Sequence, residues 1–123
     1  MGDNELDECW RIIDNKLRTL KLIGQNFKYD EFKYGLIGFV CNNVYSDTLI
    51  KTRVIFPELP EKKLHVQSSL WTREPYYKEE GKEFKLGKQK VEHLFRYNGK
   101  DCCVTYEIDE VQEQDLIDLS DVY

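Results

Sequence analysis

Long apolar runs are the clearest absence from this sequence. The longest, from Leu36 to Cys41, includes Gly38, and a bilayer-spanning helix needs about 20 apolar residues. The first residues, Met1 to Leu6, lack the basic start and apolar run of a secretory signal. We therefore expect no membrane partner and a cytoplasmic location.

Residues with catalytic or metal-binding chemistry are also few. The four cysteines show neither the dense spacing of a disulfide framework nor the short paired spacing of a zinc site. The two histidines, His65 and His93, flank no recognisable nucleophile motif. The glycines form no phosphate-binding loop, since Gly35 and Gly38 lie in an apolar stretch. These absences predict a protein that is not an enzyme and that holds no metal or cofactor.

The composition is that of a globular domain. The chain has 123 residues, of which 41% are hydrophobic and 33% charged, values that exclude collagen-like and wholly disordered chains. The formal net charge is -5, and residues 101–123 carry eight acids and no base. We expect a single domain over residues 1–110, followed by an acidic C-terminal tail over residues 111–123.

The amino-terminal segment has the periodicity of an amphipathic helix. Spacings of four and three residues place five apolar side chains on one stripe: Leu6, Trp10, Ile13, Leu17 and Leu20. This pattern predicts a helix from about Asn4 to Ile23, ended by Gly24. The same spacing fits a coiled-coil dimer, but about two heptads are too few to favour one, so we expect the helix to pack on its own sheet.

After Gly24 the pattern becomes extended. Stretches rich in Val, Ile, Thr, Tyr and Phe are separated by Asn, Asp, Pro or Gly clusters, and they predict strands over Tyr34–Cys41, Thr48–Phe56, Leu64–Arg73, Lys88–Tyr97 and Asp101–Asp109. One helix followed by strands favours an α+β fold. We expect the helix to pack on a curved antiparallel sheet of four to five strands, with a short acidic C-terminal tail or helix. The architecture resembles cystatin-like and nuclear-transport-factor-like cores, and this resemblance carries no function.

The last two predicted strands contain a hairpin signal. Asn98-Gly99 is the preferred two-residue type I′ turn. The register that it sets places opposite charges across from each other on one face: Arg96 with Asp101, Lys90 with Glu107 and Lys88 with Asp109.

Two surface features predict a protein partner. The first is a group of aromatic and arginine side chains of the kind that dominate interface hot spots, namely Trp71, Arg73, Tyr76 and Tyr77. Trp71 faces outward if the sheet is covered on one side and lies in the core if it is covered on both, and the sequence leaves both open.

The second feature is an apolar triplet between acids from Asp115 to Asp121. It resembles the SUMO-interacting motif and, apart from Ser120, a clathrin box. The resemblance implies binding as an added strand, through Leu116, Ile117, Asp118 and Leu119. The alternative is a terminal helix from about Gln112 that docks Leu116 and Leu119 on the domain.

These features together indicate a non-enzymatic protein-binding module, such as an acidic inhibitor, immunity or adaptor protein, acting on a basic partner. We expect a monomer or a weak homodimer, and no nucleic acid, because acids interrupt the basic block over residues 78–100. The alternative is a small-molecule or catalytic pocket between helix and concave sheet, using His93, Tyr106 or His65.

Overall fold

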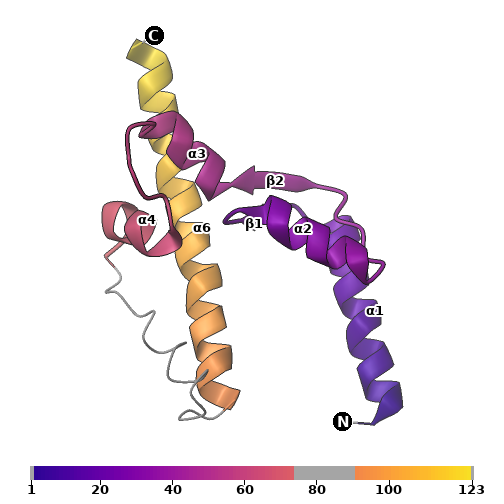
Figure 1. Ribbon diagram of the computed structural model, residues 1–123. Helices are drawn as coiled ribbons and strands as arrows, with labels where there is room; N and C mark the ends of the chain where they lie inside the picture. Colours follow the sequence, from indigo (N-terminus) through magenta and orange to yellow (C-terminus); the bar gives the residue numbers. More distant parts are fainter. Residues whose placement is uncertain (1, 74–90, 123) are drawn as a thin grey trace. The chain divides into compact units, whose positions relative to one another are not determined.

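The computed structural model describes residues 2–73 and 91–122 (Figure 1). Helices account for 72% of these residues. The chain divides into two compact units, Met1–Asp47 (unit 1) and Thr48–Tyr123 (unit 2). Across the described residues, the helices are all too short or too polar to span a bilayer.

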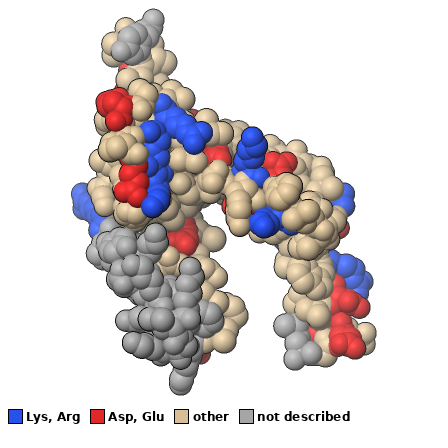
Figure 2. Space-filling model, in the orientation of Figure 1, with Lys and Arg blue, Asp and Glu red and all other residues tan. Residues whose placement is uncertain are grey.

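Unit 1 begins with helix α1, Asp3–Thr19, which confirms the predicted amino-terminal helix. The Glu5 carboxylate accepts the Gly2 backbone N–H at 3.3 Å and so satisfies a first-turn donor. Acidic side chains gather in its first turns and basic ones in its last turn (Figure 2), as the helix dipole favours. The helix ends at Thr19 rather than at Ile23, because the chain enters a strand at Leu22.

The rest of unit 1 is a small β–α–β element. Strand β1 (Leu22–Gly24) and strand β2 (Val44–Asp47) pair in parallel, and helix α2 (Phe27–Leu36) connects them. Parallel strands need such a crossover. The Asp47 carboxylate caps α2 by accepting the backbone N–H groups of Asn26 at 3.0 Å and Phe27 at 2.8 Å. Asn26 takes the left-handed conformation, with φ 56°, which Asn tolerates better than most residues.

Four aromatic rings join α1 to the β–α–β element of unit 1. The ring centroids are 5.5 Å apart for Trp10 and Phe39, 6.4 Å for Phe39 and Tyr34, and 6.5 Å for Tyr34 and Phe27. These separations lie in the range of favourable aromatic pairs. Gly24 lies so close to buried Phe27 that a Cβ at this glycine would be 2.3 Å from the ring atom Cδ2.

In the part of unit 2 that the structure describes, two short helices pack on one long helix. Helix α3 (Thr48–Ile55) and helix α4 (Leu64–Trp71) both contact helix α6 (Val91–Val122), as Figure 1 shows. The core cluster comprises Trp71, Val104 and Ile108, with Ile55 and Leu64 packed against it. Buried residues of α6 recur at helical spacing: Val104, Thr105, Ile108, Asp109 and Gln112.

The predicted curved antiparallel sheet is wrong. Among the described residues the one sheet has two strands, and they are parallel. The segments Thr48–Phe56 and Leu64–Arg73 correspond to α3 and α4, and Asp101–Asp109 lies inside α6. Apolar runs of about eight residues fit a strand and a buried helical segment equally well, and here packing on α6 selects the helix. Without that sheet, the alternative prediction of a pocket between the helix and a concave sheet has no structural basis.

The predicted Asn98-Gly99 hairpin is also wrong, because both residues lie within α6. A glycine inside a helix reduces stability by about 1 kcal/mol relative to alanine. This cost is small beside the packing of the 32-residue helix on α3 and α4. Lys88 and Lys90 of the proposed charge pairs lie outside the described residues. The helix continues through residue 110 to Val122, so residues 111–122 are helical.

Candidate functional site: the two faces of α6

The predicted partner-binding residue Trp71 is part of the core. It is 8% exposed, its ring centroid is 6.0 Å from that of Phe56, and its indole Nε1–H donates to Asp115 Oδ2 at 2.8 Å. Arg73, two residues later, is exposed. Tyr76 and Tyr77 lie outside the described residues. Trp71 is therefore a core residue rather than a surface residue, whereas Arg73 lies on the surface.

The four predicted C-terminal site residues lie on α6. Leu116 and Leu119 are half-buried, whereas Ile117 is 53% exposed and Asp118 is exposed. Gln114 Nε2 donates to Asp118 Oδ1 at 3.0 Å, one helical turn away. The segment is helical rather than extended, as the alternative prediction of a terminal helix had it. The helix begins at Val91, however, and not near Gln112.

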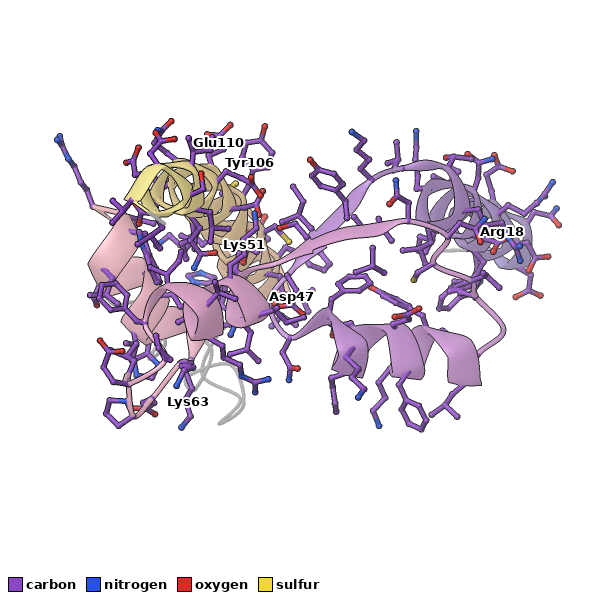
Figure 3. The ribbon with its side chains drawn as sticks, turned by 90° about the horizontal axis from the view of Figure 1, so that it is seen from above. Arg18, Asp47, Lys51, Lys63, Tyr106 and Glu110 are labelled. Carbon is purple, nitrogen blue, oxygen red and sulfur yellow. The ribbon has the colours of Figure 1, made fainter. Side chains whose placement is uncertain are left out.

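On the side of α6 that faces α3, which we call the inner face, two carboxylates of α6 bind a lysine of α3. Lys51, labelled on α3 in Figure 3, donates from Nζ to Asp109 Oδ1 at 2.5 Å and to Glu113 Oε1. The Lys51 side chain is 12% exposed and that of Asp109 is 8% exposed. Burial lowers the pKa of Lys51, but the hydrogen bonds and charges of the two carboxylates outweigh it, and the net pKa is raised. Lys51 is therefore a fixed cation that ties α3 to α6.

A neutral polar contact reinforces this interface. Gln112, fully buried on α6, donates from Nε2 to Thr52 Oγ1 at 2.9 Å and to the backbone oxygen of Thr48 at 3.3 Å. Its Oε1 has no hydrogen-bond partner in the described part of the chain. Together with Lys51, Gln112 makes the α3–α6 contact selective for one register, because a shift would leave buried polar groups unpaired.

The outer face of α6 combines acids with exposed apolar side chains. One helical stripe carries Tyr106, Glu110, Ile117 and Asp121 at spacings of four, seven and four residues. Tyr106 is 57% exposed, and Figure 3 shows Tyr106 and Glu110 on the side of α6 that faces away from α3. The adjoining stripe adds exposed side chains at Glu107, Val111, Gln114 and Asp118.

This surface was not predicted as a unit from the sequence. The predicted places were a pocket of the expected sheet for Tyr106 and a tail for the acids, whereas both lie on α6. The available signal was the spacing of Val104, Ile108, Gln112 and Asp115, which has the period of a helix and continues across the supposed end of the domain.

Within residues 2–73 and 91–122, no three side chains of His, Cys, Asp or Glu are placed to hold a metal ion. His93 is exposed and His65 half-buried. Burial raises the pKa of the Cys41 and Cys102 thiols, and the charges of Glu31 and of Asp101 respectively raise it further. A raised pKa favours the neutral thiol, which is the less nucleophilic form, at both positions.

Comparison of the chain with protein-family models, curated protein sequences and solved structures gives no match.

Proposed function

We propose that the chain is a non-enzymatic protein-binding module that holds a basic protein partner on the outer face of α6. The observation that carries this proposal is the continuous stripe of exposed acidic and apolar side chains at Tyr106, Glu110, Ile117 and Asp121. The expected inhibitor and immunity roles have no support in the described residues.

Charge supports a basic partner. Residues 101–123 hold eight acids and no base, and Lys51 of α3 offsets one of the two negative charges of Asp109 and Glu113. The outer acids Glu107, Glu110 and Asp121 remain exposed. An interface with this charge pattern attracts a basic surface and accelerates association at low salt.

Apolar side chains supply the rest of the interface. Tyr106 and Ile117 are each more than half exposed, and tyrosine is enriched among the residues that carry most of the binding energy in protein interfaces. Interfaces commonly surround such anchors with polar groups. The outer face of α6 has this arrangement, with Glu107, Glu110 and Asp118 beside the apolar side chains.

The test is capture of a partner by the immobilised full chain, followed by identification of the partner and measurement of its association rate at several salt concentrations. Glu110→Lys should lower the affinity about tenfold or more, because it places a like charge opposite a basic surface. Tyr106→Ala should have a similar effect through loss of the anchor.

The matched control is Glu58→Lys, which makes the same charge change at an exposed position between α3 and α4. It should leave the affinity within about twofold of the unmodified chain. Equal losses in Glu58→Lys and Glu110→Lys, or an association rate that does not fall with salt, would contradict the proposal.

A further inference from the structure

Helix α1 carries an apolar stripe that unit 1 covers only in part. Leu6 and Ile13 of α1, and Leu20 directly after the helix, stand at intervals of seven residues and are 44%, 40% and 47% exposed. Trp10, beside them, is 45% exposed despite its contact with Phe39. Of the stripe residues only Leu17 is buried. About two heptads are too few to identify a helix–helix seam by their spacing. The observation that points to an uncovered seam is that these side chains stay nearly half exposed in the folded chain.

The charges of α1 are divided between its two ends. Its first two turns carry four acids and no base, namely Asp3, Glu5, Asp7 and Glu8. From residue 11 to residue 21 the chain carries four bases, Arg11, Lys16, Arg18 and Lys21, and one acid, Asp14. Figure 2 shows this division, with acids toward the N-terminal end of α1 and bases nearer its C-terminal end.

Intrahelical pairs use only part of this charge. Arg11 pairs with Glu8 at 3.5 Å and Arg18 with Asp14 at 2.9 Å. Asp3 and Asp7 near one end, and Lys16 near the other, are exposed. The dipole of α1 explains why such charges are tolerated at each end, but it does not cover the apolar stripe between them.

We propose that a second copy of this chain covers the stripe, with the two α1 helices antiparallel. An antiparallel copy places the acidic end of each helix beside the basic end of the other, whereas a parallel copy places like charges side by side. A helix that covers this stripe needs an apolar stripe of its own. It also needs bases beside the acidic end of α1 and acids beside its basic end, and an antiparallel α1 meets both requirements. The resulting interface is isologous, with its two-fold axis beside Ile13.

Sedimentation of the full chain over a range of concentrations tests the association. The unmodified chain should form a dimer in the micromolar range, about the affinity of a small helical interface. Ile13→Asp should raise the dimer dissociation constant at least about tenfold, because it buries a charge at the two-fold axis. Leu6→Asp should act in the same direction from another point on the stripe.

Ile12→Asp is the matched control. Ile12 is 50% exposed, and as the immediate neighbour of Ile13 it points about 100° away around the helix. The same substitution should therefore leave dimerisation within about twofold of the unmodified chain. Circular dichroism checks that all three variants remain helical.

Cysteine cross-linking tests the orientation. In a full chain whose four native cysteines are replaced by serine, Ile13→Cys should form an intermolecular disulfide, since the two copies meet at this residue. Leu6→Cys should not, because antiparallel helices separate the two Leu6 positions by roughly 21 Å.

A monomer at about 100 µM, a dimer that persists in Ile13→Asp, or rapid cross-linking through Leu6→Cys would each overturn the proposal. None of these results bears on the outer face of α6, which belongs to unit 2 and is tested with different variants.

Discussion

The indole Nε1–H of Trp71 donates a 2.8 Å hydrogen bond to the Asp115 carboxylate and so joins α4 to α6. The two residues are 44 positions apart in the sequence. Trp71 also packs on Val104 and Ile108, so one side chain contributes both to the apolar core and to a polar contact at its edge.

From the Trp71–Asp115 contact we predict the fluorescence of Trp71 and the effect of Asp115 on the free energy of unfolding. In a Trp10→Phe chain, Trp71 is the remaining indole, and its emission should be blue-shifted and poorly quenched by acrylamide because it is 8% exposed. Asp115→Ala should reduce the free energy of unfolding by about 1–3 kcal/mol, since it leaves a buried donor unpaired. Urea denaturation followed by circular dichroism measures the change.

Asp121→Ala is the control for this substitution, because it removes an exposed carboxylate from the same helix. Its effect on stability should stay within about 0.5 kcal/mol. An equal loss in the two variants would show that the Trp71–Asp115 contact contributes nothing specific.

Replacing Lys51 should reduce the free energy of unfolding more than replacing Lys63, although both lysines form ion pairs. Lys51→Met leaves the Asp109 carboxylate, 8% exposed, without its cation, and breaking a buried pair in this way costs about 3 kcal/mol. Lys63→Met removes a base that pairs with Glu61 at the surface, where the two side chains are 65% and 49% exposed. Its cost in the same urea assay should be at most about 0.5 kcal/mol. Comparable losses would place Lys51 outside the core.

The stabilisation by Lys51 should depend on pH in one direction. The pKa of Lys51 is raised above its ordinary value of 10.5 by the hydrogen bonds and charges of Asp109 and Glu113, which outweigh the opposing effect of burial. The folded state therefore holds this proton more tightly than the unfolded chain does. From neutral pH up to about pH 10.5 the contribution is complete, and it is lost as the pH rises through the folded pKa.

The difference in unfolding free energy between the unmodified chain and Lys51→Met isolates this contribution, because the effects of groups that both chains share cancel in the difference. It should be constant near neutral pH and shrink in strongly alkaline solution. A difference that grows with pH would contradict the assignment.

Two glycines should respond to alanine with opposite signs. Gly99 is helical, and a Cβ there would meet nothing within 4 Å, so Gly99→Ala should stabilise the chain by about 1 kcal/mol. Gly24→Ala should destabilise unit 1 by about 1–3 kcal/mol, because its Cβ would press on the buried Phe27 ring. Thermal unfolding followed by circular dichroism measures both. A hairpin at Asn98-Gly99 would give the opposite sign at Gly99, since alanine resists the positive φ of a type I′ turn.

The amino-terminal helix was predictable because its information is local. Leu6, Trp10, Ile13 and Leu17 repeat at helical spacing over several turns, and no strand pattern competes with them. The sequence also locates the acids of residues 101–123, and hence the excess of negative charge on the C-terminal half of α6. It does not locate the end of α1, which depends on the pairing of Leu22 with Val44.

The remaining elements were decided by tertiary packing. The eight residues of α3 and of α4 are short enough to fit either a strand or a helix, and the buried face of α6 provides the surface that makes the helix the better choice. The same packing turns Trp71 inward and brings Lys51 to Asp109, 58 positions away. Local sequence sets which residues are apolar or charged, but only the assembled unit determines which of them face one another.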